Sequence, residues 1–258
     1  MENDINDKYF HSELKDEVMF LHLNSCLFLE QETFSHRSQL LDFLDEVNES
    51  NSIKTLVVNY DHQDFNLENY KEKWDELYNS QSYEGNILRV FRTFNQIFLK
   101  LKSMQKIVLS VFTKPVNAML FSLGMASDLR FVSRDFYIDN NNHNFVNIPK
   151  GGAAFVGLRL MYVNPIKMLF QSDKVFPTDL YQKHIVDEII DIAGLKDMVF
   201  NVAKRFSQFD YIEFEAVKIV EQSRIDILDI SLQKENDYLL SCIRKKKNLN
   251  DRHLARIK

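Results

Sequence analysis

The stretch from Lys114 to Arg159 reads KPVNAMLFSLGMASDLRFVSRDFYIDNNNHNFVNIPKGGAAFVGLR. It holds most of the glycine in the chain. The 258 residues include six glycines, well below the roughly 7% of average usage. Four of the six lie in this stretch: Gly124, Gly151, Gly152 and Gly157. A chain that avoids glycine elsewhere and places it here is expected to need special backbone geometry here.

Apolar patterns on the N-terminal side of this stretch predict alternating strands and helices. Ile53–Tyr60 and Ile107–Phe112 are rich in apolar and β-branched residues, as is typical of strands buried on both faces. Between them, Asn86–Gln105 repeats apolar residues at intervals of three and four, which predicts a helix with one apolar stripe. An amphipathic helix is expected over Thr33–Ser50, and two strands joined by a tight turn over Val18–Leu29.

The remaining segments complete an α/β pattern. Residues 1–16 are polar and are expected to be loose, and Asp61–Tyr83 has the polar, acidic composition of a loop. Strands are expected near Leu129–Val132 and Phe136–Ile138, and a short helix begins at Pro177. From Leu195 onward the pattern is helical.

Composition excludes several classes of protein. The net charge of −5 gives no support for nucleic-acid binding, which needs a basic face. Cys26 and Cys242 imply no disulfide framework. The acidic N-terminus lacks the apolar run of a secretory signal, and no uninterrupted apolar stretch approaches the length of a membrane span. The expectation is a cytoplasmic protein without a membrane segment and without a metal site.

Several short motifs, in this order and spacing, resemble the crotonase (enoyl-CoA hydratase/isomerase) superfamily. Lys114–Ala118 matches the family's Lys-Pro-X-X-Ala turn, and Asp128–Arg130 matches its Asp-Leu-Arg strand start. Ile148–Gly152, followed by Leu158–Leu160, is similar to the Ile-Pro-X-X-Gly-Gly run with one spacer fewer. His184–Ile189 matches the Gly-Leu-Val-Asp-X-Val strand, with histidine in place of glycine.

The resemblance implies a crotonase-like (ClpP/crotonase) α/β fold, a superhelix of stacked ββα units with a helical C-terminal part. It divides the chain into a core at 15–190 and a C-terminal region at 191–258 that covers the active site and forms a trimer or a hexamer. The chemistry that the resemblance implies is hydration or isomerisation of an acyl-CoA thioester.

The chain departs from the family where that chemistry is carried out. Family members place a Gly-Gly-Gly-X-Glu element between the Lys-Pro turn and the Asp-Leu-Arg strand, whereas Val116–Ser127 contains neither a glycine run nor an acid. The second family glutamate lies about fourteen residues after the aspartate, and that position holds Asn142. The loop that usually reads Phe-Ser-X-Gly-X-Asp lacks its glycine and leaves only Phe65 as a match.

The candidate site residues follow from these motifs. The weak catalytic candidates are Asp139, Asn142 and His143, which could equally belong to a solvated turn. The substrate-binding candidates are Phe65, Met119, Gly151 and Gly152, although the glycine pair is also explained by close helix–strand packing. Lys150 beside the pair could meet a phosphate or remain solvated.

Two functions stay open. In the first, the chain lacks hydratase activity and serves as an acyl-CoA-binding or scaffold subunit, for example beside an active paralogue or a pathway enzyme. In the second, it is an active acyl-CoA enzyme whose acid and base come from unusual positions such as Asp61, His62, Asp139 or His143. Neither reading requires a cofactor beyond the coenzyme A thioester itself.

Overall fold

A computed structural model describes residues 5–29, 35–60, 66–139, 150, 173–209, 211–222 and 225–257. The strands are β1 Phe10–Lys15, β2 Val18–Leu23, β3 Thr55–Asn59, β4 Ile107–Phe112, β5 Val116–Asn117, β6 Leu129–Ser133, β7 Ile138–Asp139, β8 Lys174–Val175 and β9 Glu188–Ile190. The helices are η1 Ser25–Leu29, α1 Ser35–Glu49, α2 Leu67–Asn79, α3 Tyr83–Ser103, α4 Ala118–Gly124, α7 Pro177–Gln182, α8 Ile192–Ser207, α9 Tyr211–Gln222 and α10 Ile225–Ile257.

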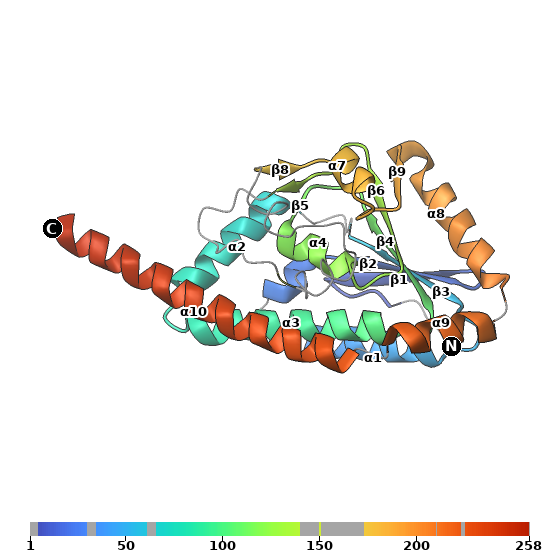
Figure 1. Ribbon diagram of the computed structural model, residues 1–258, viewed down its shortest axis with the longest axis horizontal. Helices are drawn as coiled ribbons and strands as arrows, with labels where there is room; N and C mark the ends of the chain where they lie inside the picture. Colours follow the sequence, from blue (N-terminus) through green and yellow to red (C-terminus); the bar gives the residue numbers. More distant parts are fainter. Residues whose placement is uncertain are drawn as a thin grey trace.

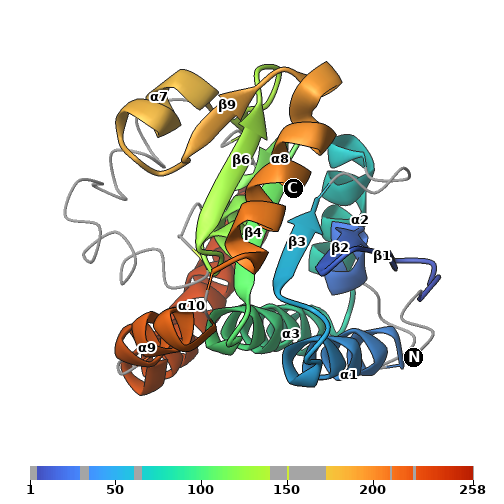
Figure 2. The same ribbon diagram turned by 90° about the vertical axis from the view of Figure 1, so that its right-hand side faces the viewer.

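The core is a six-stranded sheet with the order β1-β2-β3-β4-β6-β9. All neighbours are parallel except β1 and β2, which form an antiparallel hairpin. A second sheet, β5-β7-β8, is short. Helices α1, α3 and α10 lie along one side of the large sheet and α8 lies on the other (Figures 1 and 2).

Strand alternation divides the core into two clusters. In β3, Leu56 and Val58 belong to the large cluster that contains α1 and α3, whereas Val57 belongs to the smaller cluster under α8. Because successive side chains in a strand point to opposite faces, a strand buried on both faces must be apolar throughout. This explains why β3 and β4, which the sequence predicted as buried strands, are apolar on both faces apart from Thr55, Asn59 and Ser110.

The N-terminal segment differs from expectation. The strand pair expected within Val18–Leu29 is wrong: β2 pairs with β1, so the loose residues 1–16 contain a strand, and Ser25–Leu29 forms a 3-10 helix. The turn lies at Asp16, which has a φ of 55°. Aspartate tolerates this left-handed backbone better than most residues. Neither glycine nor proline marks the turn, so the composition did not reveal it.

The polar segment after β3 contains a helix. Asn66 caps α2, because its side chain accepts a hydrogen bond from the backbone N–H of Glu68 at 2.9 Å. Tyr70, Trp74, Leu77 and Tyr78 form the buried stripe of α2. The loop expected over Asp61–Tyr83 is therefore wrong for most of its length, because its large aromatic residues are spaced for a helix face.

His184 shows why the resemblance includes a glycine at its position. It follows the last turn of α7 with a φ of 54°, and its backbone N–H donates to the Tyr181 carbonyl at 3.0 Å. Glycine is the usual residue in this left-handed position after a helix. The backbone geometry is thus kept here although the residue is not.

Gly124 is required by close packing. A Cβ at Gly124 would lie 2.6 Å from Cε2 of Phe112. That ring stacks on Tyr60 at 4.4 Å and contacts Phe121 and Phe136, so it cannot easily move aside.

We therefore expect Gly124→Ala to lower the free energy of unfolding by about 1–3 kcal/mol, the usual cost of overpacking a core. The matched control is Gly85→Ala in α3, where an added Cβ meets nothing within 4 Å. Alanine is the better helix former, so this control is expected to gain up to about 1 kcal/mol. Urea titrations followed by circular dichroism measure both changes. Equal stability of the two variants would contradict the packing explanation.

Candidate functional site

The candidate site lies at the carboxyl ends of β3 and β4. Parallel neighbours end at the same edge of a sheet, where ligands of open α/β sheets bind. Beyond β4 the chain turns through Thr113–Pro115 into β5 and then α4. On the α4 side this edge is filled by the buried rings of Tyr60, Phe112 and Phe121.

The first turn of α4 is capped from within the chain. The side chain of Asn117 accepts a hydrogen bond from the backbone N–H of Leu120 at 2.9 Å. The first amides of a helix are the groups free to bind an oxyanion or another anion. One of these donors is therefore already occupied. Met119, a predicted substrate-binding residue, is half-buried in the same turn.

Asp139, a predicted catalytic candidate, is held in an ion pair. It lies at the end of β7, is only 8% exposed, and its Oδ2 accepts a hydrogen bond from Nζ of Lys71 at 2.9 Å. Burial alone would lower the pKa of Lys71, but hydrogen bonds and charge from Asp139 and Glu68 outweigh it and raise that pKa. The ion pair therefore occupies one oxygen of the Asp139 carboxylate.

The other candidates lie outside the described residues. These are Phe65, Asn142, His143, Gly151 and Gly152, together with Asp61 and His62 of the alternative function. Their roles stay predictions.

Lys150 is not a solvated lysine. It is 1% exposed and contacts Oδ1 of Asn95, with Glu235 at 3.7 Å and the ring centroid of Phe94 at 5.2 Å. Burial lowers the pKa of Lys150 to about 8, and the charge of Glu235 opposes that shift. The expectations of a phosphate contact or a solvated side chain are therefore wrong. Lys150 lies in the interior, between Asn95 of α3 and Glu235 of α10.

Asp128, which belongs to a motif of the resemblance, supports the framework. Its Oδ2 accepts the backbone N–H of Val108 at 2.8 Å, and its two oxygens bind Nζ of Lys218 at 2.6 and 2.5 Å. The aspartate thereby joins β4 to the helix α9.

Arg130 and Asp187 lock β6 to β9 in a similar way. The backbone N–H of Arg130 donates to Oδ2 of Asp187 at 2.7 Å, and the guanidinium donates to the carbonyls of Ile185 and Ser127. Both residues are therefore engaged in holding neighbouring strands in register.

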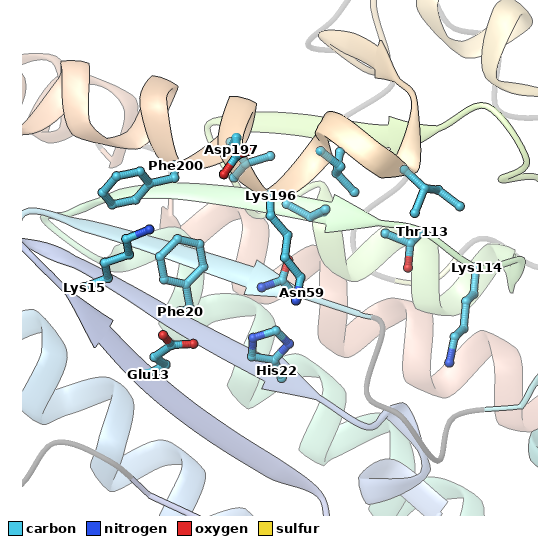
Figure 3. Close-up of a pocket in the computed structure, with 14 residues that line it drawn as sticks. Glu13, Lys15, Phe20, His22, Asn59, Thr113, Lys114, Lys196, Asp197 and Phe200 are labelled. Atoms are coloured by element: carbon cyan, nitrogen blue, oxygen red, sulfur yellow. The ribbon is translucent and has the colours of Figure 1, made fainter.

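A separate pocket of about 510 Å³ opens between the sheet and α8 (Figure 3). It is lined by Glu13, Lys15, Phe20, His22, Asn59, Val111, Thr113, Lys114, Ile192, Leu195, Lys196, Asp197, Val199 and Phe200. Sequence reasoning missed it. One sequence signal for the pocket was Asn59, an amide at the end of a largely apolar strand. The lysines that line the pocket come from distant segments, so their positions in the sequence gave no signal.

No group of three or more histidine, cysteine, aspartate or glutamate side chains that could hold a metal ion occurs among the described residues. Within the same residues, no helix combines the length and apolar character needed to cross a bilayer.

Comparison with known proteins identifies the architecture. The sequence matches no protein-family model and no curated protein. The structure, in contrast, superposes on an enoyl-CoA hydratase from Bacillus halodurans with a TM-score of 0.76, 18% identity, and coverage of 92% of this chain and 95% of that chain. The chain has the crotonase fold.

Two further solved structures agree. An enoyl-CoA hydratase from Mycobacterium avium subsp. paratuberculosis K-10 gives a TM-score of 0.69 at 16% identity, covering 93% of this chain and 92% of that one. A variant of HypX from Aquifex aeolicus gives 0.72 at 11% identity, covering 92% of this chain and 43% of that one. The crotonase fold implied by the sequence motifs is thus confirmed.

Proposed function

We propose that this crotonase-fold protein lacks hydratase activity and acts as an acyl-CoA-binding or partner subunit. One contrast carries the proposal. The motif residues that the chain keeps, Asp128, Arg130 and Asp187, are all engaged in framework contacts. The carboxylate and glycine motifs of family chemistry are missing from Val116–Ser127.

The described part of the site supports the same conclusion. An oxyanion hole needs free donors fixed close to the developing charge. In the first turn of α4, Asn117 already binds the N–H of Leu120. Asp139, the described catalytic candidate, is bound to Lys71.

The test combines two measurements on one preparation. A calorimetric titration with coenzyme A or crotonyl-CoA measures binding, and a hydration assay measures turnover. Binding without turnover supports an acyl-CoA-binding subunit. The absence of both binding and turnover supports a scaffold or partner subunit. Turnover supports the alternative, an enzyme with unusually placed acid and base residues.

A homotrimer, or a hexamer of two trimers, is part of this proposal. Helices α9 and α10 carry apolar side chains that are each more than half exposed: Ile212, Val217, Ile219, Val220, Ile227, Ile230 and Tyr238. An apolar surface of this kind marks an interaction site, and a second copy of the chain covers it most simply.

Light scattering is therefore expected to give about three or six chain masses at micromolar concentration. Val217→Asp places a charge in the proposed interface and should shift the population toward monomer, whereas Val217→Leu should not. A monomeric wild-type protein would refute the trimer.

A further inference from the structure

The pocket under α8 is on the opposite face of the sheet from α4. In β3, Asn59 lies two residues after Val57 and therefore points to the same face, the face that packs under α8. The next residue, Tyr60, stacks on Phe112. In the same way Val111 faces α8, and Phe112 faces Phe121 of α4. Because neighbouring residues of a strand point to opposite faces, a ligand in this pocket is separated by the sheet from α4 and Asp139.

Asn59 gives the pocket an unused hydrogen-bonding group. The residue is 8% exposed and lines the pocket. Within the part of the chain that the structure describes, no protein group forms a hydrogen bond with its side-chain amide, and the amide is not sealed off from the pocket. An amide that faces a pocket without a protein partner is expected to bind either water or a polar group of a ligand. The amide supplies two N–H donors and one acceptor.

The charges of the pocket are unevenly placed. In Figure 3 the Lys196 side chain extends from α8 toward Asn59. Thr113 and Lys114 lie to the right of Asn59 in this view, away from the Phe20 and Phe200 rings. The carboxylates of Glu13 and Asp197 lie nearer to the Phe20 and Phe200 rings than to Asn59. Lys15 is positioned over the Phe200 ring, with Nζ 4.1 Å from its centroid. The end of the pocket beside Asn59 is therefore cationic.

The rest of the lining is apolar. Leu195 and Val199 recur at helical spacing on the face of α8 that packs on Phe20 and Val111. A volume of about 510 Å³ is within the range of small-molecule sites, roughly 300–1,000 Å³. An apolar wall with a few convergent polar groups is the common composition of such sites.

We propose that this pocket binds a small amphipathic carboxylate. The ligand's carboxylate accepts hydrogen bonds from the Asn59 amide and the Thr113 hydroxyl and lies beside the Lys196 ammonium. Its hydrocarbon chain lies along Phe20, Val111, Leu195 and Val199. The site is independent of the proposed acyl-CoA function, because it occupies the other face of the sheet.

The test is calorimetric titration of the full chain with octanoate, and with octanol as a probe of equal chain length and no charge. Octanoate is expected to bind saturably with a Kd below about 1 mM, at least tenfold tighter than octanol. Lys196→Gln and Asn59→Leu should each weaken octanoate about tenfold. Lys234→Gln, an exposed lysine on α10 across the sheet, is the matched control and should leave the Kd unchanged.

Thermal melts of all variants establish that they are folded; Lys196 is exposed, so its variant keeps the test valid if Asn59→Leu does not fold. Absence of saturable binding, equal binding of octanol, or unchanged affinity in Lys196→Gln would each overturn the proposal. Coenzyme A is expected not to displace octanoate. Competition would place both ligands in one site and contradict the separation of the two faces.

Discussion

Lys218→Met is expected to lower the free energy of unfolding by about 3 kcal/mol, the low end of the cost of removing one partner from a buried ion pair, because the Asp128 side chain is still 18% exposed. Lys218 is 5% exposed on α9, and its ammonium binds both oxygens of Asp128. Without it the Asp128 carboxylate keeps the N–H of Val108 as a hydrogen-bond donor but has lost the cation that faces it. The reduction comes from this uncompensated charge.

An exposed pair of the same type is the matched control. Lys204 of α8 binds Asp16 at 2.9 Å, but the two side chains are 50% and 54% exposed. Lys204→Met is therefore expected to cost no more than about 1 kcal/mol. Adding Asp128→Asn to Lys218→Met should restore part of the stability, because the partly buried carboxylate is then no longer charged. Urea unfolding of the four proteins measures these differences. If Lys218→Met lowered the free energy of unfolding by less than Lys204→Met does, the Asp128–Lys218 pair would not anchor α9.

The fold was predictable where local pattern and tertiary environment agree. The buried strands at Ile53–Tyr60 and Ile107–Phe112 and the helix after Asn86 were confirmed, because apolar spacing alone specifies such elements. The hairpin at Asp16 was missed, since its turn uses a left-handed aspartate and no glycine. Helix α2 was missed because its exposed surface is acidic and its buried side has only four residues, Tyr70, Trp74, Leu77 and Tyr78.

The site was less predictable, because its contacts join distant segments. The spacing of the sequence identified Asp139 and Asp128 but gave no sign that Lys71 and Lys218 bind them. Lys150 beside two glycines was expected to meet a phosphate or to remain solvated, whereas the fold buries it near Glu235 of α10. Such pairings depend on tertiary placement, which one sequence without its fold does not contain.

The absence of hydratase activity is the second large effect that we expect. Removing one oxyanion donor from an acyl-transfer site costs about 10²–10³ in rate. Losing general acid–base help costs roughly 10²–10⁴. Both glycine motifs and both carboxylates are absent from their family positions, and the N–H of Leu120 is bound to Asn117. The losses need not add, because the groups act as a unit, but even the smaller figures together leave little catalysis.

Restoring one group is therefore expected to fail. Asn142→Glu returns a carboxylate to the position of the second family glutamate. It supplies no amide donors for the thioester oxygen, so the variant should remain as inactive as the wild type.

The most direct test is the rate of crotonyl-CoA hydration by the purified wild-type protein, followed by the loss of absorbance of the conjugated thioester. We predict a rate indistinguishable from the reaction without protein, and the same rate for Asn142→Glu. Clear wild-type hydration that is abolished by Asn142→Ala or Asp139→Ala would contradict the proposal that this crotonase-fold protein has lost its hydratase chemistry.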